Sequence, residues 1–199
     1  MATHRTAQEV NAGSMADIAF LLLIFFLVTA SIETDAGINK MLPPQNDEII
    51  AEFKDRNVLK ISMNNTNDLM VNGELLNVKS LREKVVTFLD NGESSCDYCQ
   101  GGGVDYLSEN PTKAIISIKT QRNTSYPLYV SVQNEVLAAY NHLRNRESLR
   151  LFNVSFQDME KEYYMEETKE DIKRERKGQI ESVRELYPQR ILEPENIND

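Results

Sequence analysis

The chain has 199 residues and a formal net charge of −9, from 22 Lys and Arg against 31 Asp and Glu. The part after residue 32 is also acidic, with 21 basic and 29 acidic residues, which argues against a nucleic-acid partner. Two cysteines and two histidines, with one histidine placed before the first apolar segment, are a poor set for a four-ligand zinc site. We therefore expect no metal.

The first expected element is an apolar run, Ala12–Ile32, in which Asp17 is the only charged residue. A 21-residue helix rises about 32 Å, enough to cross a bilayer core of about 30 Å. An ionised carboxylate in hydrocarbon costs at least about 2.5 kcal/mol, so such a residue normally faces a protein interior or a wet cavity. The run predicts a transmembrane helix, and Asp17 indicates a partner and the movement of protons or ions.

Two alternatives compete with this interpretation. The segment could be a cleaved signal peptide with a small-residue site at 28–30, although only Arg5 precedes it as a basic side chain. The helix could also begin at Ser14, which would place Asp17 in a first turn favoured by the helix dipole. The remaining 15 residues would then extend about 22 Å, which is short for a span. We favour the deeper placement of Asp17.

Residues at helical spacings of three and four share a face with Asp17: Gly13, Ser14, Phe20, Leu21 and Ile24. Gly13 and Ser14 would allow another helix to approach closely, and the Ser14 hydroxyl could donate to the acid. Alternatively, these small residues mark a frayed helix start. Arg5 before the run and acids after it favour a cytoplasmic N-terminus (1–11), a span (12–32) and an exported remainder.

A linker is expected over 33–56. Its first part is polar, and Met41-Leu42-Pro43-Pro44 should be extended, because proline fixes its own φ and disfavours a helical predecessor. From the residues alone, the element Leu42-Pro43 is a stiff spacer.

A small α+β domain is expected over 57–156. The strand Val58–Met63, the turn Asn64–Asp68 and the strand Leu69–Val71 form a predicted hairpin. Asn77 or Ser80 can cap the next helix, whose apolar positions are Val78, Leu81, Val85 and Leu89.

The second half of this domain continues with a strand, Ala114–Ile118, and a helix that starts near Pro127. The inward positions of that helix are Val132, Val136, Tyr140 and Leu143. A last strand is expected at Leu149–Phe156. This alternation predicts helices on one side of a small sheet.

Cys96 and Cys99 lie in a stretch rich in Ser and Gly. Outside the membrane a local disulfide is the expected state. A thioredoxin-type role needs the first cysteine at a helix N-terminus, and the glycines at 101–103 oppose a helix there. We interpret the loop as an insertion without redox catalysis.

The tail, 157–199, is charged and predicts one or two helices that end at Pro188. Gly178 interrupts it at a cost of about 1 kcal/mol. A weak apolar stripe, Ile172, Ile180, Val183 and Leu186, could dock a partner or lie back on the domain. A solvated helix is the simpler expectation.

The stretch Met15–Ala30, followed by Lys40-Met41-Leu42-Pro43-Pro44, resembles the ExbD/TolR family of bacterial inner-membrane proteins. The family pattern is an N-terminal span with one acid in its cytoplasmic half, then a short linker that ends in Leu-Pro. The resemblance continues more faintly through the strand at 113–119 and the helix with Tyr126 near its start. It covers about residues 10–156.

This resemblance implies a non-enzymatic component of a proton-driven motor in the inner membrane, with the folded domain in the periplasm. It also implies no covalent catalysis and no soluble cofactor. Two copies would place their spans inside a ring of ExbB- or TolQ-like subunits, with Asp17 as the proton-binding group. Energy would pass to a TonB- or TolA-like partner, and the Leu42-Pro43 element could pack at the channel mouth or add to a partner as a strand.

Three other functions stay open. The chain could be an exported or anchored binding domain whose first 30 residues serve only for export. It could be a TolR-like subunit for envelope maintenance, or a subunit similar to those of flagellar stators, which also use one acid in a span. The sequence leaves the transducer, the copy number and the choice between protons and sodium ions undetermined.

Overall fold

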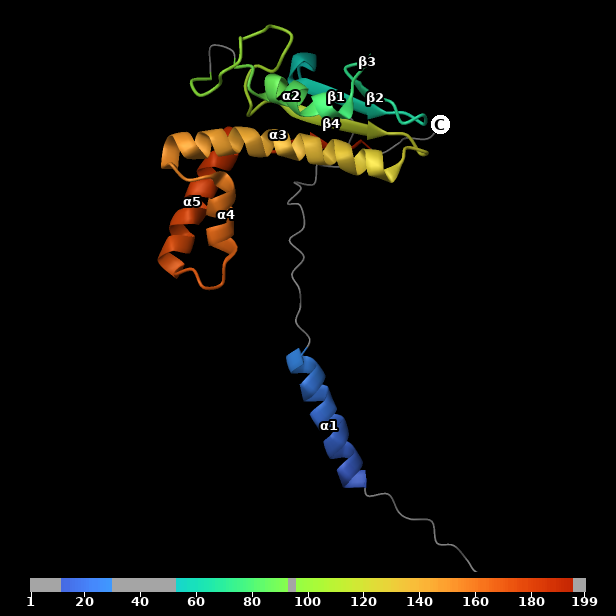
Figure 1. The fold of residues 1–199 in the computed structure, drawn as a ribbon, viewed down its shortest axis with the longest axis vertical. Helices are drawn as coiled ribbons and strands as arrows, with labels where there is room; N and C mark the ends of the chain where they lie inside the picture. The colour runs from blue at the N-terminus through green and yellow to red at the C-terminus, as the bar shows by residue number, and fades with distance from the viewer. Residues whose placement is uncertain (1–11, 30–52, 93–95, 195–199) are drawn as a thin grey trace, which may run out of the picture. The chain divides into compact units, whose positions relative to one another are not determined.

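The computed structural model describes residues 12–29, 53–92 and 96–194 of the chain. The chain forms two units, 1–39 and 40–199, which we treat separately. The described part of the first unit is one helix, α1 (Ala12–Thr29) (Figure 1). Within the described residues, a search for helices of sufficient length and apolar character to cross a membrane found none. The end of the expected span, 30–32, and most of the linker, including Leu42 and Pro43, lie outside the described residues.

The second unit is built on a five-stranded sheet in the order β3-β2-β1-β4-β5. The strands are β1 (Val58–Met63), β2 (Leu69–Val71), β3 (Glu74–Leu75), β4 (Ile115–Thr120) and β5 (Ile191–Leu192). Neighbours β1 and β2, and β2 and β3, are antiparallel, whereas β1 with β4 and β4 with β5 are parallel. The predicted hairpin is confirmed as β1 and β2, and the strand predicted at Ala114–Ile118 is confirmed as β4.

Two helices, α2 (Val78–Leu89) and α3 (Tyr126–Phe152), cover one face of this sheet (Figure 1). Leu59 pairs with Ile116 in register, and all three inward residues of β1 belong to the core. Asn77 caps α2 by accepting from the Lys79 amide at 3.0 Å, as predicted. The predicted inward residues of α3 are confirmed as buried: Val132, Val136, Tyr140 and Leu143.

The strand predicted at Leu149–Phe156 is wrong. Helix α3 continues to Phe152, where Asn153 ends it in a left-handed conformation with φ of 54°. A further helix, α4 (Phe156–Tyr164), begins after Ser155, whose side chain accepts from the Asp158 amide. Leu149 and Leu151, which lie in the predicted strand, are both exposed on the helix.

The tail is a helical hairpin of α4 and α5 (Glu170–Leu186) (Figure 1). One or two helices were predicted there; the tail forms two, and α5 ends just before Pro188. The stripe is not fully solvated, because Ile180 and Val183 pack with Phe156 and Met159 in a second small core.

Beyond α5 the chain returns to the sheet. Tyr187 and Ile191 join the main core, and the Ile116 amide donates to the Arg190 carbonyl at 2.9 Å. The tail therefore supplies an edge strand of the sheet, so it is part of the folded domain. Near the start of the unit in the sequence, the short 3-10 helix η2 (Asp55–Asn57) leads into β1.

Candidate functional site

The acid predicted to carry function lies in α1. Asp17 is exposed, and helical spacing places it on one face with Phe20, Leu21 and Ile24, whose side chains are also exposed. All other side chains described in α1 are exposed as well, although most of them are large and apolar. An apolar surface of this extent marks contact with a membrane or another protein. The part that Gly13 and Ser14 play beside the acid stays a prediction.

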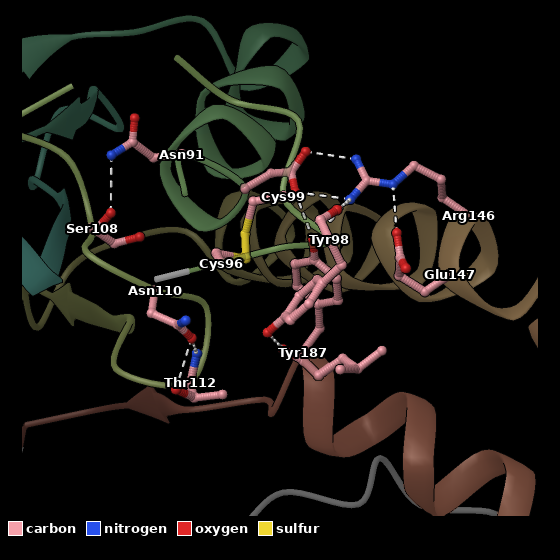
Figure 2. Close-up of a disulfide and its surroundings, with 12 residues drawn as sticks. Asn91, Cys96, Tyr98, Cys99, Ser108, Asn110, Thr112, Arg146, Glu147 and Tyr187 are labelled. Atoms are coloured by element: carbon pink, nitrogen blue, oxygen red, sulfur yellow. Dashed lines mark hydrogen bonds and ion pairs between the residues drawn. A yellow bond between two sulfur atoms is a disulfide. The ribbon is translucent and has the colours of Figure 1, made fainter. Parts of the chain in front are cut away.

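The largest polar cluster of the folded domain lies at the C-terminal end of α2. The Arg146 guanidinium donates to both carboxylate oxygens of Asp90, at 2.6 and 2.8 Å, and the Tyr187 hydroxyl donates to the same carboxylate at 2.5 Å. Figure 2 shows Arg146 and Tyr187 converging beside the loop that carries Cys96 and Cys99. A two-pronged contact of this kind fixes geometry as well as charge.

A second carboxylate, Glu147, is buried next to this pair. It accepts from Arg146 at 3.0 Å and from Arg150 at 2.6 Å. On the same helix, Arg144 donates two bonds to the Tyr187 carbonyl, at 3.0 and 2.8 Å, and burial lowers the pKa of Arg144 to about 10. Every carboxylate oxygen of Asp90 and Glu147 thus accepts a bond from this chain, so the cluster stabilises the fold rather than binding a ligand.

The loop beside this cluster is closed by a disulfide between Cys96 and Cys99. Burial raises the pKa of Tyr98, which lies between the two cysteines, to about 12, and its hydroxyl donates to the Leu186 carbonyl at 2.9 Å. Burial and the bond to Asp90 also raise the pKa of Tyr187. Both tyrosines therefore stay protonated donors at neutral pH.

The surface of the described part of the domain includes the following hollows. One, of about 360 Å³, lies where β4 ends and α3 begins, and Arg122, Tyr126 and Glu193 contribute to its lining. The other, of about 430 Å³, lies between α4 and α5 and is lined by two tyrosines with three basic residues and one glutamate. Neither is lined by cysteine or histidine, and the described residues contain no group of three or more His, Cys, Asp or Glu that could hold a metal ion.

An apolar helix with a single acid, followed by a small α+β domain, defines the class of protein. The sequence matches the family model of biopolymer transport protein ExbD/TolR over residues 3–145. This match spans α1 and the domain through most of α3, and the chain belongs to the ExbD/TolR family. No curated protein matches the chain. Family membership assigns the chain an accessory role in biopolymer transport.

Proposed function

We propose that this protein is the ExbD-like subunit of an inner-membrane motor driven by the proton motive force. It couples proton passage at Asp17 to a periplasmic TonB-like partner and so to transport across the outer membrane. The observation that carries the proposal is the position of Asp17, the single charged residue of the apolar run, in the N-terminal third of a helix whose described side chains are exposed.

The proposed span is the whole apolar run, 12–32, which is three residues longer than α1. Its apolar side chains would contact lipid and an ExbB- or TolQ-like ring, and the ring would supply the polar surroundings that a carboxylate needs within a membrane. A second copy of the chain would complete the pair inside that ring. Residues 1–11 would be cytoplasmic and the α+β domain periplasmic.

The energy available per proton limits the mechanism. Moving one charge through the full potential is worth about 2.3 kcal/mol per 100 mV, whereas a folded domain is stable by about 5–15 kcal/mol. One proton can therefore bias the rotation or sliding of the helix but cannot unfold the domain. Work on the partner would accumulate over several protons, with the domain moving as a folded body.

Complementation of a strain that lacks this protein tests the proposal. Asp17→Asn keeps the shape of the side chain but removes its proton exchange, so it should abolish energised uptake at normal abundance and insertion. Asp17→Glu should retain part of the activity, and Phe20→Leu, on the same face, is the matched control for packing. Full activity of Asp17→Asn would overturn the proposal and return the segment to export or anchoring.

The same strain distinguishes the TolR-like alternative. A protein that serves a TolA-like partner would, when inactivated, cause loss of envelope integrity while energised uptake persists. A TonB-linked protein would give the opposite result. Asp17→Asn should cause whichever of these two losses applies. The comparison therefore identifies the partner, and the test of Asp17 addresses the coupling mechanism.

A further inference from the structure

The loop closed by the disulfide contacts the tail where the chain leaves α5. The disulfide joins Cys96 and Cys99, which are only three residues apart, so it constrains little chain beyond Asp97 and Tyr98. Figure 2 shows Tyr98 directed from this small ring toward Tyr187, which comes from the far end of α5. Any wider effect of the disulfide therefore depends on the contacts that Tyr98 makes with the tail.

Tyr98 touches the tail at two points. Its ring meets the Tyr187 ring edge-on, with 5.5 Å between the centroids, and its hydroxyl donates to the Leu186 carbonyl at 2.9 Å. Arg146 reinforces this contact, because one of its nitrogens donates both to the Tyr98 carbonyl at 3.3 Å and to the Tyr187 hydroxyl at 2.8 Å. The loop and α3 together hold the chain where it leaves α5.

The surrounding loop is shaped around the closed disulfide. Gly92 has a φ of 56°, and a Cβ atom there would lie 2.2 Å from the Cys99 Cβ. The Gly101 amide donates to the Asp90 carbonyl at 2.9 Å, which returns the loop to the end of α2. Cys99 thus packs where only glycine fits opposite it, and the bridge sets the direction in which Tyr98 leaves the loop.

The element secured downstream is β5. This strand has two residues and pairs with β4 alone, so it has little stability of its own. It is anchored by Tyr187, which is fully buried, and by Ile191, which is 7% exposed. Tyr187 is held by Tyr98 on the loop side, and by Arg144, Arg146 and Asp90 through hydrogen bonds to its carbonyl and hydroxyl groups.

We propose that the Cys96–Cys99 disulfide is a redox-sensitive clamp that holds the C-terminal strand in the sheet. A dithiol reductant breaks the S–S bond: both cysteines become thiols, and the dithiol is oxidised to its own disulfide. Tyr98 then loses its fixed direction, the contacts with Tyr187 and Leu186 weaken, and β5 leaves the edge of β4. The strand thus responds to the redox state of a loop that lies about 90 residues earlier in the sequence.

Hydrogen exchange in the full chain, in detergent, tests the clamp. With dithiothreitol, amides of 187–193 should exchange at least about tenfold faster, equivalent to about 1.4 kcal/mol, which one aromatic pair and one hydrogen bond can supply. Amides of β1 should be unchanged. The Cys96→Ser/Cys99→Ser double variant should show the faster exchange without reductant and no response to it.

Variants at Tyr98 separate the clamp from a general effect of the disulfide. In the oxidised protein, Tyr98→Ala should release 187–193 to the same extent, and Tyr98→Phe to a smaller extent, because it keeps the ring and loses only the hydroxyl. Tyr106→Ala, in the same loop and 76% exposed, is the matched control and should have no effect. Unchanged exchange of 187–193 in the reduced chain or in Tyr98→Ala, or faster exchange throughout the sheet, would overturn the proposal.

Discussion

The buried carboxylate of Asp90 gives the sharpest test of how the domain is held together. We consider Asp90→Asn, which preserves the shape of the side chain and removes its charge. The change removes the bidentate ion pair between Asp90 and Arg146. It also takes a charged acceptor away from the Tyr187 hydroxyl. Arg146 then loses one of its two carboxylate partners, and the Tyr187 hydroxyl keeps only a neutral acceptor in a largely buried site.

The magnitude follows from burial. Removing one partner of a buried ion pair costs about 3–5 kcal/mol. The Arg146 side chain here is 21% exposed and keeps Glu147 as a second partner, so we expect a loss of about 2–3 kcal/mol. For a domain of this size that corresponds to a melting temperature lower by about 6–9 °C. The matched control is Asp55→Asn, because Asp55 pairs with Lys60 at 3.1 Å with its side chain 94% exposed, and should cost less than about 1 kcal/mol.

Thermal unfolding of the full chain in detergent measures both variants. The chain has eight tyrosines and no tryptophan, so near-ultraviolet circular dichroism reports tertiary contacts of the tyrosines, including Tyr98 and Tyr187. A loss in Asp90→Asn that does not exceed the loss in Asp55→Asn would refute the argument that Asp90 ties the end of α2 to α3 and to the tail. Equal losses would mean that water screens the pair despite its burial.

Further predictions concern the stability of the domain at acid pH and the effect of substituting two of its glycines. The bonds from Lys54 and Lys113 lower the pKa of Glu109 to about 2 from an ordinary 4.5, so its stabilisation is complete above pH 4.5 and is lost as the pH falls toward 2. Urea unfolding of Glu109→Gln should show a flatter decline over that window than the parent chain; an identical decline would contradict this. The substitution Gly178→Ala in α5 should stabilise by about 1 kcal/mol, because its added Cβ meets no atom within 4 Å. The matched change Gly73→Ala is equally open but has a φ of 86°, so it should destabilise by about 1 kcal/mol; a gain in urea resistance there would contradict the strain argument.

Much of the fold could be predicted because its signals are local. Alternation in Val58–Met63 and the polar turn after it predicted the first hairpin, and Asn77 marked the start of α2. Pro127 indicated where α3 begins, and the three-and-four spacing from Val132 to Leu143 indicated which side faces the sheet. Each of these signals is contained within one or two turns or strands of chain.

The failure at Leu149–Phe156 has a physical reason. The buried side of α3 continues four residues beyond Leu143 to Glu147, and there a carboxylate stands where an apolar residue would show the helical period. Without that residue in the pattern, Leu149 and Leu151 alternate like a strand. A buried acid is tolerable there because the guanidinium groups of Arg146 and Arg150 both donate to it, and they are recognised as its partners once the structure places them.

The strand β5 and the cluster around Asp90 could not be predicted, because they depend on contacts between distant parts of the sequence. A two-residue strand shows no period, and the bond from Tyr187 to Asp90 spans 97 residues. One local cue for β3 was present, since Asn72 and Gly73 both adopt the positive φ that a two-residue hairpin turn requires. The role of Asp17 in α1 stays a prediction that the activity assay must test.

The extent of the family match bears on what the tail contributes. The match ends at residue 145, immediately before Arg146, and the structure shows that the fold does not end there. Asp90 lies within the matched part, yet the groups that meet its charge come from the residues that follow. Because an unpaired buried carboxylate costs several kcal/mol, the matched region of this chain is incomplete without the returning tail. The hairpin of α4 and α5 therefore lies inside the domain as an insertion between α3 and β5, and it packs on α3, the helix that carries Arg146.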